Sequence, residues 1–542
     1  MLRQGLVVCI YATIVLVKCQ ESRIVNIHQG PVRGYKSQDG NYFGFFGIPF
    51  ATAPKGVHRF KAPLPPPSWK EPLEAVNLNV ACPQNDRDIQ NIYLKRQEDC
   101  LIANIYVPES NVSNLPVYVS VHGGAFQYGY GEIKTPVNLM KSREIIVVSF
   151  NYRVGALGML CLGTEDVPGN AGLKDQIALL RWVQKNIAAF GGNPHEVTIG
   201  GCSAGGSSVD ILSASKLIKG LFNKVITQSG PNTASYSVQV DPISNAKMIA
   251  RQLNFENVDD LEALEHFYKT TPLSVLSSIP LSNRTDSSVI FAPCVERDVG
   301  QEMVLHDYPA RILAKGDYFK LPMLYGMTNM EGIYRLPFFE KWKDLMNQNF
   351  TLFLPDNLFF ENEKDKAEVI RKLKYFYFGD DPVSEKNIMG YVKYISDVMF
   401  SYGTALTVRL HNEAGNEEVY LYEYSFVDKD QDYIPYTELR GATHCSQNAA
   451  FMDLGDENDL SEEYKQMKSI LRKMWLNFIK TGKPVPENSS YPQWPPVSSG
   501  ASPYMSLNTT PRLIKKDLLK DRFKLWDDIY KKHFRHPIPP TP

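Results

Sequence analysis

A serine stands between two glycines in the stretch Gly201-Cys202-Ser203-Ala204-Gly205. The run EVTIGG (196–201) before it predicts a strand, and the small residues after it allow a helix to begin. Small neighbours at such a sharp turn leave the Ser203 hydroxyl exposed as a nucleophile, and the Ala204 amide at the helix start faces developing negative charge. The pattern alone equally fits a Gly/Ser-rich turn without chemistry.

A second glycine-rich turn lies upstream, in VHGGAF (121–126), directly after the predicted strand LPVYVS (115–120). Backbone amides in such a turn can point at an oxyanion, and each donor is typically worth about 3 kcal/mol of barrier. A plain tight loop is the alternative. The position of this turn, two predicted strands before Ser203, favours the oxyanion role.

A serine nucleophile needs a base, and the base needs a carboxylate that orients it. Of the ten histidines, His444 lies in the small-residue stretch GATHCSQNAA (441–450), after the last strong predicted strand. Glu331 follows another predicted strand, LPMLYGMT (321–328). The chain order serine, acid, histidine is the one that accompanies a serine at such a strand-to-helix turn. Three other histidines lie on or beside polar helical stretches, and we expect them at the surface: His266, His306 and His411.

Strand-like apolar runs alternate with longer helical patterns along the chain. Helical spacing is clearest in 171–190 and 460–482. The continuous apolar character of several runs predicts strands buried on both faces, and therefore an α/β fold with a mostly parallel central sheet flanked by helices. The strand-like runs are 104–108, 115–124, 144–153, 196–201, 224–230, 321–328 and 418–426.

Taken together and in order, these motifs resemble the type-B carboxylesterase and cholinesterase family over essentially the whole chain after the first twenty residues. The resemblance implies an α/β-hydrolase fold and a single domain over 20–542, although 542 residues alone suggest about three or four domains. The stretches that carry it are 45–63, 98–108, 121–126, 149–160, 168–206, 228–230, 329–332 and 441–444.

Carried over by position, the resemblance implies a serine carboxylesterase in which Ser203 forms an acyl-enzyme, His444 is the general acid/base and Glu331 orients it. The oxyanion donors are then the amides of Gly124, Ala125 and Ala204, with Ala125 where the family usually has a third glycine. The resemblance also matches Cys82–Cys100, which encloses a short polar loop, as a disulfide, and it matches two charged pairs: Arg153 with Asp175, and Arg59 with Glu98.

The loop between Cys82 and Cys100 contains no tryptophan. Cholinesterases carry there an aromatic residue that binds a quaternary ammonium by cation–π attraction, so we do not expect choline esters as substrates. In character the chain is closest to insect secreted carboxylesterases, including antennal odorant-degrading ones. We expect small apolar esters, such as odorant- or pheromone-type acetates or xenobiotics. Candidate pocket residues, each also compatible with ordinary core, are Phe126, Tyr128, Phe291, Phe338 and Phe339.

Two other functions remain open: a catalytically silent secreted ligand-binding protein of the same family, and a lipase. Silent relatives typically lose the serine or the histidine, and here Ser203, Glu331 and His444 are all present. The formal net charge of −1 gives no electrostatic reason to expect a nucleic-acid partner, and the cysteines and histidines are not at zinc-site spacing. We therefore expect neither a cofactor nor a metal.

Cys202 stands where the family commonly has Glu or Gln, and Cys445 follows His444. If Ser203 and His444 meet, these two cysteines are neighbours as well. They form a disulfide or pack as two small buried thiols, and both interpretations stay open. Cys161 and Cys294 have no assigned partners, and the pairing among Cys161, Cys202, Cys294 and Cys445 stays open.

Residues 1–19 are typical of a cleaved signal peptide, with Arg3 before an apolar stretch of twelve residues (6–17) that is too short to span a bilayer. A membrane anchor or a buried strand is the alternative. We therefore expect a secreted protein without a membrane anchor. Export makes the Asn-X-Ser/Thr sites usable for glycosylation. The candidates are Asn111, Asn283, Asn349, Asn488 and Asn508.

Overall fold

The computed structural model describes residues 20–38, 40–85, 93–110, 112–131, 136–280, 284–452, 457–498 and 502–541. The predicted signal segment and the sequons at Asn111 and Asn283 lie outside the described residues.

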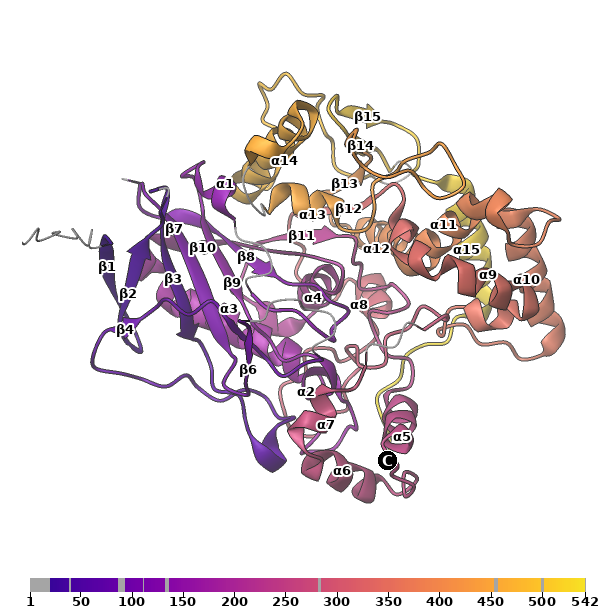
Figure 1. The fold of residues 1–542 in the computed structure, drawn as a ribbon, viewed down its shortest axis with the longest axis horizontal. Coiled ribbons are helices and arrows are strands. Elements are labelled where there is room, and N and C mark those ends of the chain that lie inside the picture. Colours follow the sequence, from indigo (N-terminus) through magenta and orange to yellow (C-terminus); the bar gives the residue numbers. More distant parts are fainter. Residues whose placement is uncertain are drawn as a thin grey trace, which may run out of the picture.

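A 13-stranded sheet runs through the described part of the molecule (Figure 1). Seven neighbouring strands pair in parallel, in the spatial order β9-β8-β10-β11-β12-β13-β14. Antiparallel strands extend both edges of this parallel part. In spatial order the strands are β1 (Ser22–Ile27), β2 (Gly30–Lys36), β3 (Tyr42–Pro49), β7 (Ile102–Pro108), β9 (Ile146–Phe150), β8 (Leu115–Val121), β10 (Gly192–Cys202), β11 (Lys224–Gln228), β12 (Met323–Thr328), β13 (Val419–Tyr424), β14 (Tyr504–Leu507) and β15 (Arg512–Ile514), with β4 (Leu73–Glu74) beside β2. A separate pair consists of β5 (Val80–Ala81) and β6 (Lys95–Arg96).

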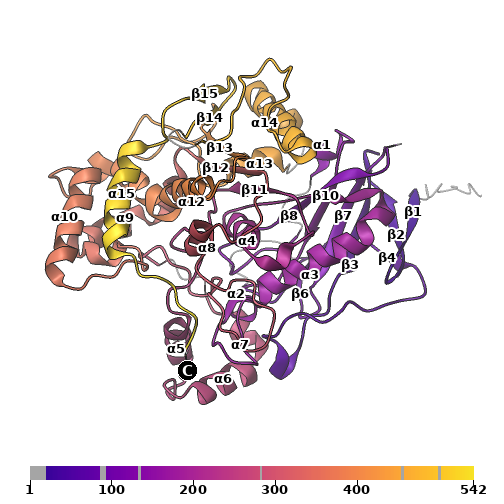
Figure 2. The same ribbon diagram turned by 180° about the vertical axis from the view of Figure 1, so that it is seen from behind.

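Helices cover both faces of the sheet, as Figures 1 and 2 show from opposite sides. The long α14 lies over one face, α3 lies over the other, and α9, α10, α11 and α15 gather beyond the carboxyl-terminal half of the sheet. The helices are α1 (Val137–Met140), α2 (Gly155–Met159), α3 (Ala171–Asn186), α4 (Ala204–Ser213), α5 (Pro242–Gln252), α6 (Leu261–Thr270), α7 (Leu273–Ser277), α8 (Pro309–Lys315), α9 (Phe339–Gln348), α10 (Glu363–Phe378), α11 (Ile388–Ser396), α12 (Tyr402–Glu413), α13 (Ser446–Phe451), α14 (Glu462–Thr481) and α15 (Lys520–His533).

The two faces of the sheet bury two separate hydrophobic cores. Along β8, Val117 and Val119 belong to the core on the α3 side, whereas Tyr118 between them belongs to the core that includes Trp475 of α14. Because side chains alternate across a strand, burial on both faces needs apolar residues at consecutive positions, which is why these strands are continuous apolar runs in the sequence. The predicted mostly parallel α/β architecture is confirmed.

The predicted elements occur with adjusted ends. The pattern at 460–482 becomes α14, which stops at Gly482 in the left-handed conformation (φ 78°). The pattern at 171–190 divides, because α3 ends at Asn186 and Ile187–Phe190 continues as a tighter 3₁₀ turn. Such tightening is common at helix ends, where the last carbonyls lack partners.

The expectation for His411 is wrong. It lies on α12 and is fully buried, with Nε2 2.9 Å from the Tyr325 hydroxyl and Nδ1 2.8 Å from the Tyr318 hydroxyl. The buried Asp210 carboxylate accepts a hydrogen bond from the same Tyr325 hydroxyl. A polar helix face can be buried when another element supplies partners, and the sequence does not reveal those partners. His266 is exposed and His306 is half-buried.

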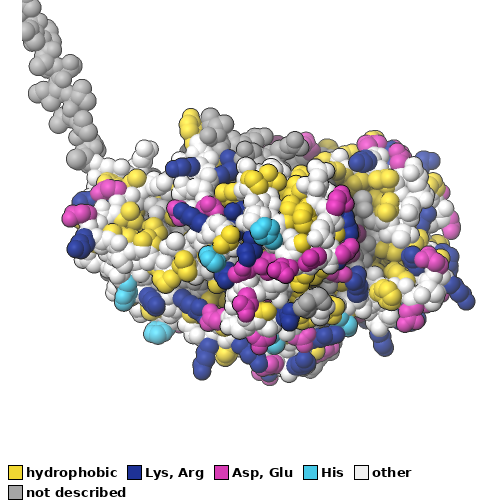
Figure 3. Space-filling model, turned by 90° about the horizontal axis from the view of Figure 1, so that it is seen from below, with side chains coloured by type: hydrophobic (Ala, Val, Ile, Leu, Met, Phe, Trp, Pro, Cys, Tyr) yellow, Lys and Arg dark blue, Asp and Glu magenta, His cyan; other side chains and the backbone are white. Residues whose placement is uncertain are grey.

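Of the two charged pairs, Arg153 and Asp175 form a buried ion pair with an N–O distance of 2.6 Å. Arg59 instead donates hydrogen bonds to the carbonyl oxygens of Gly56 and Thr271. On the face in Figure 3, Lys and Arg side chains intermingle with Asp and Glu. None of the helices in the described part of the chain combines the length and apolar character needed to cross a membrane.

Candidate active site

Ser203 occupies a sharp turn between β10 and α4, with φ 60° and ψ −129°. Its N–H donates to the Gln228 carbonyl on the neighbouring strand (2.9 Å). A non-glycine residue in this region of φ and ψ typically costs about 1–3 kcal/mol, so the packing around the turn must enforce it. The strained turn lies at the carboxyl edge of the parallel strands, the edge where α/β sheets bind ligands.

Glycines around the turn allow this packing. A Cβ on Gly205 would lie 2.2 Å from the Val121 carbonyl oxygen, and a Cβ on Gly230 would lie 2.0 Å from the Ser203 carbonyl oxygen. Both distances are far below any real Cβ contact, so the chain segments meet only because these positions lack side chains. The sequence pattern of glycines therefore reflects contacts with other strands.

Glu331 follows β12 and is fully buried. Its Oε1 accepts two hydrogen bonds, from the Thr328 backbone N–H (2.7 Å) and from the Ser229 hydroxyl (2.5 Å). Its Oε2 is 2.6 Å from Nδ1 of His444. A carboxylate only accepts, so Nδ1 carries the proton and the neutral ring presents the Nε2 lone pair.

His444 sits in the loop between β13 and α13. The loop is fixed beside Glu331, because the Ala442 N–H donates to the Asn329 side chain (3.0 Å) and the Met330 N–H donates to the Ala442 carbonyl (3.3 Å). The imidazole stacks on Phe400, with ring centroids 4.2 Å apart. These contacts fix the position and the plane of the ring.

Ser203 and His444 line one cavity of about 400 Å³. Gly124 and Ala125 line it as well, whereas Ala204 is buried directly behind Ser203 at the start of α4. Other lining residues are mostly aromatic or apolar: Tyr128, Tyr236, Val289, Tyr334, Phe338, Met399 and Phe400, with Gly123, Ser288, Arg335 and Asn448. The structure thus brings Ser203, His444, Gly124 and Ala125 to one cavity. Glu331 lies behind His444, and Ala204 lies behind Ser203.

The glycine turn after β8 packs against Ser203. A Cβ on Gly123 would lie 2.7 Å from the Cys202 carbonyl oxygen and 3.3 Å from the Ser203 Cβ. Gly124 and Ala125 have φ values of 108° and 52°, so Ala125 adopts a conformation more typical of glycine. This close approach brings two backbone segments beside the serine, as an oxyanion site requires.

His122 at the start of this turn is neutral. Its ring stacks on Tyr152 (centroids 4.1 Å apart) and its Nδ1–H donates to the Gly123 carbonyl (2.9 Å). Burial lowers the pKa of His122 to about 4, because the charged form would lose its hydration. His122 therefore supports the turn without bringing positive charge to it.

Two residues of the site were not predicted. Ser229 donates to Glu331, and the Gln447 side chain donates to the Ser229 hydroxyl (2.7 Å). Both are buried. The sequence signal for Ser229 is its place at the end of the strand-like run 224–230, in the stretch QSG (228–230) that also contributes to the family resemblance.

Three disulfides are present in the described residues. Cys82–Cys100 has the pairing that the resemblance implied, and Cys161–Cys294 joins the pair that was left unassigned. Cys202 and Cys445 form the third, with their Cα atoms 6.0 Å apart, so the disulfide and not the pair of free thiols is present.

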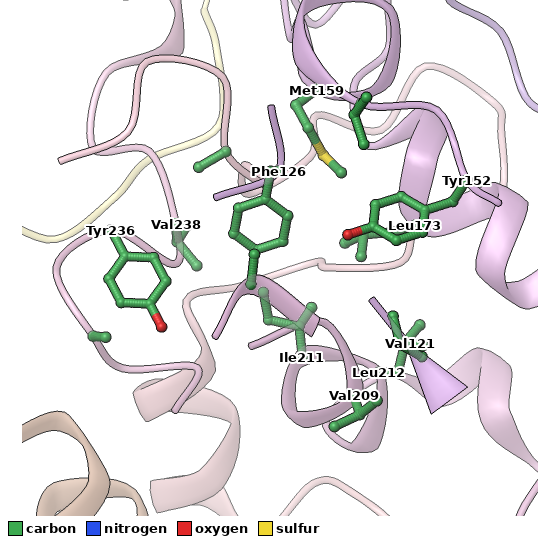
Figure 4. Close-up of a cluster of buried hydrophobic side chains, with 14 of the residues drawn as sticks. Val121, Phe126, Tyr152, Met159, Leu173, Val209, Ile211, Leu212, Tyr236 and Val238 are labelled. Atoms are coloured by element: carbon green, nitrogen blue, oxygen red, sulfur yellow. The ribbon is translucent and has the colours of Figure 1, made fainter. Parts of the chain in front are cut away.

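The aromatic candidates divide between the cavity and the core. Tyr128 and Phe338 line the cavity, whereas Phe339 (2% exposed) and Phe291 (1%) are ordinary core. Phe126 is fully buried, and Figure 4 shows it among Tyr152, Met159 and Ile211. Neighbours in sequence, such as Phe338 and Phe339, differ because a helix turns successive side chains to different sides.

The sequons also differ in exposure. Asn349 and Asn488 are exposed, whereas Asn508 is half-buried and its side chain accepts a hydrogen bond from the Thr510 N–H (2.8 Å). Within the described residues, no group of three or more His, Cys, Asp and Glu side chains is arranged to hold a metal ion.

Comparisons with known proteins identify the family of the chain. The model of the carboxylesterase family matches residues 21–526. Esterase FE4 of Myzus persicae is 33% identical over 500 residues, covering 88% of this chain and 86% of its own length. Juvenile hormone esterase of Heliothis virescens is 29% identical over 508 residues, covering 88% of each chain.

A solved structure shares the fold as well. Juvenile hormone esterase from Manduca sexta, with OTFP covalently attached, superposes with a TM-score of 0.83 at 28% identity, covering 94% of this chain and all of that one. The sheet, with helices on both faces, is that of an α/β-hydrolase. The chain belongs to the carboxylesterase family and is a carboxylic ester hydrolase that acts on small-molecule esters.

Proposed function

We propose that this protein is a secreted serine carboxylesterase that hydrolyses small apolar esters through an acyl-enzyme on Ser203. The observation that carries the proposal is the 2.6 Å contact between His444 Nδ1 and the buried Glu331 carboxylate, in a histidine that lines the same cavity as Ser203. That contact fixes the tautomer in which Nε2 is a base.

The reaction follows from these parts. His444 Nε2 takes the proton of the Ser203 hydroxyl as the oxygen attacks the ester carbonyl, and the resulting imidazolium is stabilised by Glu331. The tetrahedral intermediate collapses, and the imidazolium gives its proton to the departing alcohol. Water then attacks the acyl-enzyme with the same histidine as base, which releases the acid and restores Ser203.

We assign the oxyanion site to the backbone N–H groups of Gly124, Ala125 and Ala204. The positive φ values at Gly124 and Ala125 and the position of Ala204 at the first turn of α4 support this assignment. Compared with glycine, the Ala125 methyl group narrows the acyl side of the cavity, which favours short acyl groups.

The cavity favours uncharged, apolar esters. Its volume of about 400 Å³ fits a small ligand, and apolar and aromatic side chains such as Val289, Phe338 and Met399 line it. Arg335 contributes a positive charge to the wall of the cavity. Its guanidinium carbon lies over the Tyr334 ring, 4.7 Å from the ring centroid. A quaternary ammonium would be repelled there, so acetates of apolar alcohols fit better than choline esters.

Export and a single domain over 20–542 complete the proposal. The three disulfides and the exposed sequons Asn349 and Asn488 support passage through an oxidising secretory compartment. The family match over 21–526 and the sheet that joins strands from Ser22 to Ile514 support the single domain.

The test is to treat the purified protein with an organophosphate and map the adduct by peptide mass spectrometry. We expect one adduct on Ser203, absent in Ser203→Ala, together with loss of acetate-ester hydrolysis. Folded protein without an adduct would instead favour a silent ligand-binding member of the family.

A further inference from the structure

The Cys202–Cys445 disulfide joins the residue before Ser203 to the residue after His444. The two cysteines are 243 residues apart in sequence, and both line the candidate active-site cavity. No other disulfide in the described residues touches this cavity. This disulfide therefore lies beside both the candidate nucleophile and the candidate base.

The loop that carries His444 depends on such ties. Between the end of β13 at Tyr424 and the start of α13 at Ser446, the chain forms no helix or strand. The hydrogen bonds of Ala442 described above tie the loop to the segment that carries Glu331. The disulfide ties the same loop covalently to β10, and so to the turn that presents Ser203.

Cys445 itself adopts a left-handed conformation, with φ 63° and ψ 14°. Glycine or asparagine suits such a position, and another residue typically costs about 1–2 kcal/mol there. A cysteine held in this conformation indicates that its side chain, and not its backbone freedom, is what the position requires.

The Cys445 sulfur also lies 3.6 Å from His444 Nε2. A disulfide sulfur carries no proton and cannot donate to the Nε2 lone pair, so the lone pair stays available for the Ser203 hydroxyl. A Cys445 thiol at the same place could donate its proton to Nε2 and compete with Ser203.

We propose that the Cys202–Cys445 disulfide is a positioning element for catalysis: it holds His444 in register with Ser203 and keeps Nε2 free to act as base. The proposal rests on the acyl-enzyme function proposed above. Opening the bond transfers two electrons in total, one to each sulfur, and each sulfur takes up one proton. A phosphine supplies the electrons and is oxidised to the phosphine oxide, with water as the source of its oxygen and of the two protons. The released loop and the new thiol both slow proton transfer.

The exposure of the cysteines determines which disulfide a reductant opens first. Cys445 is half-buried at the wall of an open cavity, whereas Cys82, Cys100, Cys161 and Cys294 are at most 1% exposed. Access limits the rate of exchange, so mild reduction selects Cys202–Cys445. The other two bonds then keep the fold intact during the experiment.

The experiment is mild reduction of the secreted protein with a water-soluble phosphine, followed by kinetics with an acetate ester. A non-reducing peptide map of an alkylated sample identifies which bond has opened. We expect kcat to fall about 10- to 100-fold, as for a misplacement of about 1 Å, while KM changes less than threefold and the unfolding temperature stays above the assay temperature. Reoxidation should restore kcat.

The matched control is the double variant Cys202→Ala/Cys445→Ala, which should show the lower kcat from the start and should not respond to the phosphine. If the opened enzyme, with Cys202 and Cys445 alkylated and the other bonds intact, keeps wild-type kcat, the proposal is wrong. Oxidised wild-type protein that forms no Ser203 adduct would overturn the esterase mechanism itself, so the two failures are distinguishable.

Discussion

Replacing Glu331 with glutamine should be more damaging than deleting its side chain, because of the hydrogen bonds at the two carboxylate oxygens. Oε1 accepts from the Thr328 backbone N–H, which cannot be turned away, and from Ser229. In Glu331→Gln the amide oxygen must take this place, since an NH₂ group there would face a fixed donor. The NH₂ group then faces His444 Nδ1.

A donor opposite Nδ1 forces the imidazole proton onto Nε2, the atom that must accept the Ser203 proton. A wrong tautomer of this kind lowers kcat about 10⁴-fold in serine hydrolases. Glu331→Ala removes the charge but leaves the tautomer free. Its cost is the lost attraction between carboxylate and imidazolium, about 4 kcal/mol at 4 Å in a medium of effective dielectric constant 20, or roughly 10³-fold.

The assay is the steady-state hydrolysis of p-nitrophenyl acetate by wild type, Glu331→Gln and Glu331→Ala. Each variant is first shown to be folded by circular dichroism and thermal unfolding, since both changes disturb buried hydrogen bonds. The rate of Ser203 phosphorylation by an organophosphate should fall in the same order as kcat. A Glu331→Gln enzyme within tenfold of wild type, or faster than Glu331→Ala, would refute the reasoning.

Burial, close backbone packing and charge each give one further prediction. Burial lowers the pKa of His122 from 6.5 to about 4, so the unfolded chain binds this proton more readily than the folded protein does. The free energy of unfolding of wild type should therefore fall by about 3 kcal/mol as the pH falls from 6.5 to 4. In unfolding titrations, His122→Asn should lack this pH dependence, and parallel plots of unfolding free energy against pH for the two proteins would contradict the prediction. Gly230→Ala places a Cβ 2.0 Å from the Ser203 carbonyl oxygen and should abolish the Ser203 adduct while the protein still secretes. Arg335→Gln should raise kcat/KM for a choline ester about five- to tenfold relative to its uncharged isostere; an unchanged ratio would exclude a charge effect.

The strands of the central sheet could be predicted from the local sequence. The apolar runs predict β7 through β13 because each strand is buried on both faces, and that burial appears directly in composition. The turns at Gly123 and Ser203 were also predictable, since a tight approach of backbones excludes side chains wherever it occurs.

The burial or role of some residues depends on a partner that is distant in sequence. The sequence around such a residue does not predict it. His411 was expected at the surface because its own helix is polar there, but Tyr318 and Tyr325 supply its partners from another element. Ser229 and Gln447 gain their role only because β11 and α13 meet beside Glu331. Cys161–Cys294 likewise depends on the path of the chain between them.

The sequence by itself determined the fold class and the candidate residues of the site, because strand burial, tight turns and the order of serine, acid and histidine leave local patterns. Only the tertiary structure decided which oxygen of Glu331 faces His444, which aromatic rings line the cavity, and that Cys202 and Cys445 are bonded. The physical reason is distance: each of these facts is a contact of a few ångströms between segments up to 243 residues apart.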